Sequence, residues 1–259
     1  MDRRDLLTGN YTKNRLDLSK SIDSTYAYAK LVGTADKAMV HYSLEGTIFA
    51  YLPGGPIPFI GFQAILKGVW EKLEQDSFRY TLFESGFFHS LNSKNHIEIF
   101  QNPITKKENQ LSYIKGGPYE SIIKPNQLDW VVSGDDIWIQ EPKTRKGYFG
   151  NSESGEQKKQ TSFANVIFKG KLSELNDSTT IASSMMTYNY LSPWYPFFDM
   201  DDVDGNMYWQ AVGNKIQSWS DVPETMKNFL NQQSDNYFES TNPWSETTST
   251  LKNYRKNSK

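Results

Sequence analysis

The chain has 259 residues, with 28 basic and 30 acidic side chains, three histidines and no cysteine. This length suits one large domain, and the near-neutral charge argues against the basic face that binds nucleic acid. No apolar run approaches the roughly 20 residues that span a bilayer, and the absence of cysteine excludes a thiol nucleophile, disulfides and thiolate-bound metals. We therefore expect one globular domain that binds neither nucleic acid nor membrane.

The N-terminus resembles the start of a twin-arginine export signal because Arg3 and Arg4 precede two leucines. Such a signal continues with an apolar segment of about 7–15 residues, whereas polar residues fill positions 10–15 here. The arginines are either ordinary charges of a tail or the remnant of a signal that no longer works. Both interpretations predict a cytoplasmic protein with a tail over residues 1–16 and one domain over residues 17–259.

The first predicted elements are a helix over Ser21–Val32 and a strand over Met39–Leu52. Along this strand, apolar side chains such as Val40 alternate with polar ones such as His41, which indicates two chemically different faces. Further strands are predicted over residues 59–70 (with a break near Gly68), 78–88, 96–101, 110–114, 130–132, 137–140, 163–169, 181–190 and 207–212.

Two other segments complete the pattern. Residues 143–160 are polar and contain several glycines, so we expect a mobile surface loop there. Residues 221–232 predict a helix that starts with a capping box between Asp221 and Glu224. Many short strands with regular turns are typical of an antiparallel barrel or sandwich. The predicted fold class is therefore mainly β: a single antiparallel β-barrel with a few peripheral helices.

Two pairs of residues are candidates for acid–base chemistry. His41 and Glu45 lie on one face of the first strand with Ser43 between them, and His96 and Glu98 alternate in the same way. Tyr42, next to His41, is a further acid–base candidate. A histidine with a nearby carboxylate can titrate near neutrality, as general acid–base catalysis requires. The alternative is that both pairs lie on the solvent-facing sides of ordinary strands.

Lys215 is a further candidate, because a desolvated lysine can form a Schiff base or stabilise an oxyanion. The alternative is an ordinary surface lysine. A metal site built from His41, His96 and a carboxylate is conceivable, since these ligands suit zinc or iron, but the spacing does not demand one. We expect a protein that works without a cofactor.

Aromatic residues are frequent, with 15 Phe, 15 Tyr and 7 Trp. They are densest over residues 192–200, where Pro193 and Pro196 exclude the interior of a helix. Such a segment can form the rim of a pocket, or it can be a rigid lid that closes the end of a barrel. The residues that we expect in the wall of a pocket are Trp130, Trp138, Trp194, Tyr195 and Trp209.

Several segments carry a resemblance through their order along the chain. They are residues 26–33, 44–50 with the break at Pro53 and Gly54, 100–105, 192–198, Gly205, 213–215 and 222–223. Together they resemble a bacterial and fungal domain family of unknown function, numbered 1838, from residue 17 to about 254. The resemblance implies a bent, calycin-like barrel and no settled activity. Gln101, Lys106 and residues 197–200 depart from the family pattern, which suggests a different ligand.

These expectations lead to a functional hypothesis. A small hydrophobic organic molecule binds in an aromatic-lined barrel pocket and undergoes a cofactor-independent cyclisation, isomerisation or elimination in cytoplasmic biosynthesis, chemistry that needs a dry cavity and one or two acid–base groups. The alternatives are a lipocalin-like carrier without catalysis and a carbohydrate-binding module. A titratable group in the pocket favours the enzyme, a purely apolar lining favours the carrier, and an exposed row of Trp and Tyr favours the sugar binder.

Overall fold

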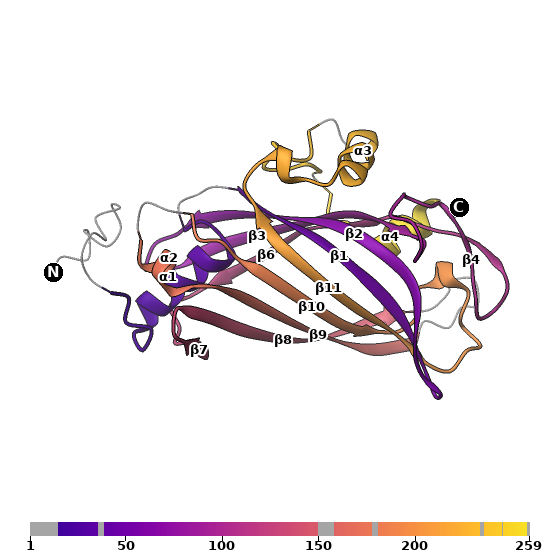
Figure 1. Ribbon diagram of the computed structural model, residues 1–259, viewed down its shortest axis with the longest axis horizontal. Helices are drawn as coiled ribbons and strands as arrows, with labels where there is room; N and C mark the ends of the chain where they lie inside the picture. The colour runs from indigo at the N-terminus through magenta and orange to yellow at the C-terminus, as the bar shows by residue number, and fades with distance from the viewer. Residues whose placement is uncertain are drawn as a thin grey trace.

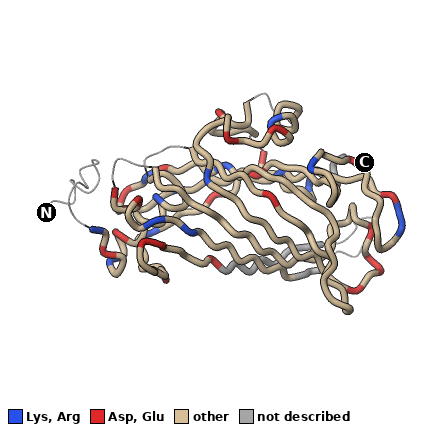
Figure 2. Tube along the Cα trace, in the orientation of Figure 1, with Lys and Arg blue, Asp and Glu red and all other residues tan. Residues whose placement is uncertain are grey.

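The computed structural model describes residues 15–35, 39–149, 158–177, 181–233, 236–244 and 246–257. The tail that resembles an export signal therefore lies almost entirely outside the described residues. None of the helices described is long and apolar enough to cross a membrane. Charged residues of both signs are interspersed along the chain (Figure 2).

Eleven strands are present in the described part of the chain. Their bounds are β1 (Met39–Leu52), β2 (Gly55–Lys72), β3 (Phe78–His89), β4 (Ile99–Gln101), β5 (Glu108–Gln110), β6 (Ile114–Ile123), β7 (Trp130–Ser133), β8 (Asp136–Phe149), β9 (Lys158–Lys171), β10 (Met185–Ser192) and β11 (Asn206–Ile216). The helices are α1 (Ser21–Val32), α2 (Leu172–Asn176), α3 (Glu224–Gln233) and α4 (Thr250–Asn257), with short 3-10 turns η2 (Pro196–Phe198) and η3 (Trp219–Asp221).

Nine of the strands form one antiparallel sheet in the order β6-β3-β2-β1-β11-β10-β9-β8-β7, and β4 pairs with β5. The sheet curls into a half-barrel, with α3 on its convex side and α1 inside one end (Figure 1). The predicted mainly β class is confirmed. The predicted closure into a calycin-like barrel is wrong, because β6 and β7 end the strand order and do not pair within the described residues.

The helix α1 is tied to the chain segment that joins the two edge strands. The chain that leads from β6 to β7 is bonded to this helix: the backbone N–H of Asn126 donates to Thr25 Oγ1 (2.9 Å), and that of Leu128 donates to Ser24 Oγ (3.0 Å). The indole N–H of Trp130 donates to the same Ser24 oxygen (2.9 Å). These bonds hold the connection between the two edge strands against the helix, whereas the outer edge of β6 pairs through Gly117 with Thr248.

The two faces of the sheet bury different residues, as the alternation along β1 predicted. The concave face and α1 share the larger hydrophobic cluster, which includes Tyr42, Leu44, Phe62, Phe88, Met207 and Trp209. The convex face carries a smaller cluster beneath α3 and residues 236–244, which includes Ile65, Phe83, Phe87, Met226, Phe229 and Tyr237. Because side chains alternate between faces, one set of strands supports two separate environments.

Four segments differ from the sequence prediction. The helix predicted over 221–232 begins at Glu224, and Asp221 instead forms a capping box with Ser218 in η3. β2 continues through Gly68, where a β-carbon would lie 2.6 Å from the Tyr80 ring, so the glycine makes room for a neighbour and does not break the strand. β6 was not predicted beyond residue 114; it is an edge strand, where Pro118 is tolerated. Of the predicted loop, residues 143–149 and 158–160 belong to β8 and β9, and 150–157 lie outside the described residues.

Candidate functional site

The concave face holds a small cavity between aromatic rings. Its volume is about 90 Å³, and its lining includes Leu44, Phe62, Ala64, Glu84, Tyr188, Tyr190, Tyr195 and Trp209. The Trp209 ring packs edge-on against Phe62 (4.9 Å between centroids) and lies 5.6 Å from Tyr195 and 6.4 Å from Tyr190. Two of the five predicted wall residues, Tyr195 and Trp209, therefore line this cavity.

Polar groups also reach the concave cavity. The indole N–H of Trp209 is buried and has no hydrogen-bond partner among the described residues. The Glu84 carboxylate lines the cavity, and its Oε2 lies 2.9 Å from where a β-carbon on Gly116 would stand, with the Tyr119 hydroxyl 2.8 Å from the same point. Burial, together with Tyr190 and Tyr188, raises the pKa of Tyr195 well above its ordinary value. Tyr195 therefore remains protonated, as a hydrogen-bond donor.

The aromatic segment before β11 is fixed by a buried asparagine. The side-chain amide of Asn102, fully buried, donates to the Phe198 carbonyl (2.8 Å), and its Oδ1 accepts from the backbone N–H groups of Ile104 (2.8 Å) and Thr105 (3.1 Å). This locks η2 against the turn that contains Asn102. The rings of Phe197 and Phe198 and the indole of Trp194 are buried in the concave cluster, while Tyr195 from the same segment lines the cavity.

The other two predicted wall residues lie elsewhere. Trp130 is bonded to α1 through Ser24. Trp138 is half-buried on β8, between the buried Ile137 and Ile139 in sequence, and so projects from the opposite face. Alternation in sequence showed that the two faces differ, but it did not show which tryptophans the curvature brings together.

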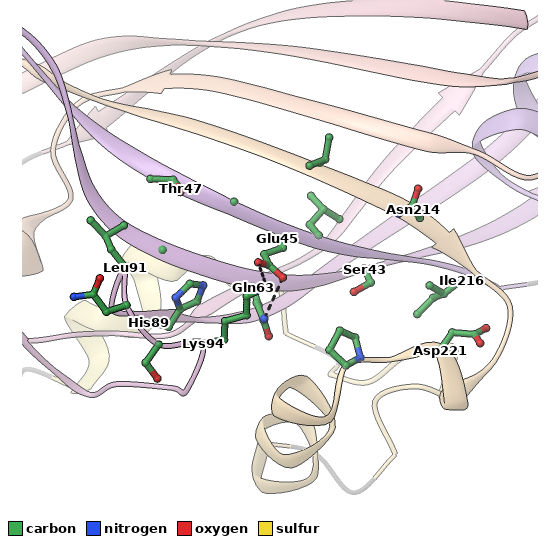
Figure 3. Close-up of a pocket in the computed structure, with 17 residues that line it drawn as sticks. Ser43, Glu45, Thr47, Gln63, His89, Leu91, Lys94, Asn214, Ile216 and Asp221 are labelled. Carbon is green, nitrogen blue, oxygen red and sulfur yellow. Dashed lines mark hydrogen bonds and ion pairs between the residues drawn. The ribbon is translucent and has the colours of Figure 1, made fainter.

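A second hollow lies on the convex face, on the other side of the same strands. This convex groove has a volume of about 740 Å³, and its floor is formed by β1, β2 and β11, with residues 91–94 on one wall and Asp221 and Pro223 on the other (Figure 3). Glu45 forms an ion pair with Lys94, and the Gln63 amide lies 3.5 Å from Glu45 Oε2. The Thr225 hydroxyl donates to Gln63 Oε1 (2.8 Å), which links α3 to the floor.

His89 also lines the convex groove. Its ring covers Gly61, where a β-carbon would lie 2.1 Å from His89 Cε1, so only glycine fits beneath it. Nδ1 lies 2.8 Å from the Ser90 carbonyl oxygen, which can only accept, so Nδ1 carries the proton of this bond. Nε2 is buried without a partner among the described residues. In the neutral ring, Nε2 is an unused acceptor.

The structure separates the predicted acid–base residues. His41 stacks on Phe238 (3.9 Å) beneath residues 236–244, where burial and the nearby Lys67 lower its pKa to about 3. His96 packs between Phe87 and Phe229, and burial lowers its pKa. Of the two carboxylates, Glu45 lies in the convex groove and Glu98 is exposed after His96.

Tyr42 and Lys215 project to the concave side, where both form hydrogen bonds with carbonyl oxygens at the C-terminal end of α1. The Tyr42 hydroxyl is 3.2 Å from the carbonyl oxygens of Leu31 and Val32, and burial raises its pKa. The Lys215 ammonium donates to the carbonyls of Lys30 (3.1 Å), Gly33 (2.8 Å) and Ala182 (2.9 Å). Burial lowers the pKa of Lys215 to about 7. These bonds satisfy carbonyls that a helix end leaves open.

Sequence reasoning did not assign a site role to four of the charged or titratable residues that line the hollows: Glu84, His89, Lys94 and Asp221. Glu84 had a signal: it shares a strand face with the apolar Leu82 and Phe88, where a carboxylate is out of place. His89 had none, because it comes at the very end of its strand. Among the described residues, no group of three or more His, Asp or Glu side chains is arranged to hold a metal ion.

A family model described as "Protein of unknown function (DUF1838)" matches residues 37–258. No curated protein matches the sequence. The match covers every strand of the half-barrel, so both hollows lie within the family's domain.

Proposed function

Because the chain belongs to the DUF1838 family, whose function is unknown, we propose a function from the geometry of its concave cavity. In this proposal the protein binds a small hydrophobic organic molecule that carries an oxygen atom, between the rings of Trp209, Phe62 and Tyr195. The observation that carries the proposal is the buried indole N–H of Trp209, which lacks an acceptor in a cavity lined by rings. A buried donor without a partner is costly, so a ligand oxygen that accepts from it gains affinity.

The size of the cavity limits the ligand. At about 90 Å³ it is smaller than an engineered cavity of about 150 Å³ that binds benzene. A single-ring ligand therefore has to move a side chain of the wall. Tyr188 and Tyr190 are only half-buried, so they can move at less cost than the fully enclosed rings around them.

Phenol is a suitable probe for this proposal because it combines one ring with one oxygen. We expect binding that is detected by saturation-transfer NMR and by a change in tryptophan fluorescence, and toluene should bind more weakly. Ala64→Leu should abolish phenol binding, because Ala64 lines the cavity and the larger side chain fills it. Ser43→Leu adds similar bulk on the other face of the sheet and is the matched control. If phenol binds Ala64→Leu as well as the original protein, the proposal is wrong.

Catalysis is the second candidate, and the Glu84 carboxylate in the cavity favours it over a purely passive carrier. In a cofactor-independent isomerisation, Glu84 takes a proton from a carbon next to a carbonyl, the Trp209 N–H stabilises the oxygen of the resulting enolate, and the proton returns to a carbon. Cyclisation and elimination can begin with the same proton transfer. The sugar-binding alternative lacks support, since no tryptophan is among the exposed large apolar side chains that the structure describes.

Cyclohexanone tests the proton transfer without knowledge of the natural substrate. In D₂O, a base that removes a proton next to the carbonyl returns deuterium to the same carbon, and NMR measures the exchange. We expect the protein to accelerate this exchange, Glu84→Gln to lose the acceleration, and Glu71→Gln, a change at an exposed carboxylate, to keep it. If Glu84→Gln still binds phenol and the rate of deuterium exchange into cyclohexanone is the same as with the original protein, Glu84 is not a catalytic base. The proposal then reduces to ligand binding without catalysis.

A further inference from the structure

The convex groove differs in charge from the concave cavity, and it does not take part in the function proposed above. Two carboxylates line it, Glu45 from β1 and Asp221 from η3, and Lys94 is the one lysine among the lining residues that the structure describes. Figure 3 shows Ser43 between the two carboxylates on the floor. The hydrogen bonds that Asp221 Oδ2 accepts from Ser218 lower the Asp221 pKa, so this group stays ionised.

The Lys94 ammonium indicates the kind of group that can bind at Glu45. Its ammonium lies on the Glu45 carboxylate, yet the two side chains are 61% and 45% exposed. An ion pair with this exposure contributes little to stability, so a second ammonium can replace the first at low cost. Lys94 sits in the connection after β3, outside any strand or helix, which allows its side chain to leave without disturbing the sheet.

Two further features favour a ligand with several N–H donors. The His89 Nε2 acceptor is unused. Its ring covers Gly61, the diagonal neighbour of Glu45 across β1 and β2, and diagonal neighbours are about 7–8 Å apart. The lining contains no aromatic ring apart from this imidazole, so stacking of a flat ligand is not favoured. The volume of about 740 Å³ lies within the range of about 300–1,000 Å³ usual for ligand sites.

We propose that the convex groove is a binding site for an aliphatic diamine, in which one ammonium replaces Lys94 at Glu45 and the other lies near Asp221. When Lys94 leaves, the groove retains two carboxylates without a compensating cation, and a dication restores the balance. His89 Nε2 accepts a second N–H from the ammonium at Glu45 once residues 91–94 move with Lys94.

Calorimetric titration of the full chain with 1,5-diaminopentane at low ionic strength tests this proposal, because salt screens such contacts. We expect Glu45→Gln to weaken binding by at least about tenfold, the usual loss for a hydrogen bond to a charged group. Lys94→Ala should strengthen binding about two- to fivefold, since it removes a competitor held by an exposed pair. Glu71→Gln removes a carboxylate from another exposed pair, with Arg79, and should change nothing.

The opposite signs of the Glu45 and Lys94 effects separate this site from general attraction between a cation and an acidic protein. Equal binding by Glu45→Gln and the original protein, or no gain from Lys94→Ala, would overturn the proposal. So would binding of 1-aminopentane or 1,5-pentanediol as tight as that of the diamine, because the first lacks the second ammonium and the second lacks both. Ala64→Leu should leave diamine binding unchanged, which keeps this test independent of the concave cavity.

Discussion

The two faces of β1 differ in what covers them and in what their hollows can hold. On the concave face, Tyr42 and Leu44 pack into a continuous cluster of rings and aliphatic side chains that the curl of the sheet encloses. On the convex face, His41 is covered by residues 236–244 while Glu45, four residues on, lines an open groove. Curvature thus buries most of one face, whereas the other is covered only where a separate segment lies over it.

The largest expected effect contrasts two phenylalanines on opposite faces. Phe198 is fully buried in the concave cluster, beside the rings of Phe59, Phe88 and Phe100. Phe198→Ala should lower the free energy of unfolding by about 3–5 kcal/mol, because it removes a large buried side chain and leaves a cavity. Phe163 is 45% exposed, and Phe163→Ala should cost less than about 1 kcal/mol. Urea unfolding measures both.

The stability of Phe163→Ala tests directly whether this part of the convex face is exposed. Leu191, which pairs with Phe163 across β9 and β10, is also exposed, as are Met185 and Val212 farther along β10 and β11. If Phe163→Ala were as destabilising as Phe198→Ala, this part of the convex face would have to be buried in solution, and the distinction between an enclosed and an open face would fail there.

The covered part of the convex face should show itself in the pH dependence of stability. The His41 pKa is about 3 in the fold and near 6.5 in an unfolded chain. Between these values the unfolded chain binds more protons, so stability falls as pH falls through this window, by at most about 1.4 kcal/mol per pH unit. His41→Phe keeps a ring against Phe238 and removes this contribution. Urea unfolding from pH 7 to pH 4 should give a shallower slope for the variant.

The comparison of slopes above neutrality is the control for His41. There the imidazole is neutral in both the folded and the unfolded state. The free energy of unfolding should therefore change with pH by the same amount in the original protein and in His41→Phe. Parallel slopes between pH 4 and 6.5 would show that His41 can accept a proton in the fold. The cover formed by residues 236–244 would then have to open far more readily than the stacked ring beneath it indicates.

The sequence predicted the elements whose signals are local. The alternation along Met39–Leu52 gave β1 and its two faces, and the spacing of apolar residues over Ser21–Val32 gave α1. The N-cap of α1 is Lys20, which makes no side-chain capping bond. The sequence did not predict β6 beyond residue 114, because glycines and prolines such as Gly116, Gly117 and Pro118 are unfavourable within a strand. Gly117 has φ +99°, a conformation that glycine adopts readily, and the proline is accommodated because the strand is at an edge.

Closure and the sites depend on contacts that the sequence pattern does not contain. The bonds from Ser24 and Thr25 to residues 126–130 join positions about a hundred residues apart, and the edge of β6 pairs with Thr248, which is more than a hundred residues along the chain. Glu84 and Trp209 meet only because β3 and β11 curl toward the same interior. The sequence pattern predicted which faces of the strands are polar and which are apolar. It did not predict which strands contribute residues to each hollow.

The smallest expected effect concerns the groove and decides whether Glu45 serves the fold or a ligand. Glu45→Gln should change the free energy of unfolding by less than about 1 kcal/mol, because its pair with Lys94 is exposed and glutamine can still accept from Gln63. Urea unfolding of Glu45→Gln and Lys94→Ala, with Glu71→Gln alongside, measures this. A loss of more than about 2 kcal/mol would show that Glu45 anchors α3 through Gln63 and Thr225. A near-zero change leaves a carboxylate that the fold does not need, in the larger of the two hollows, as ligand binding on the open face requires.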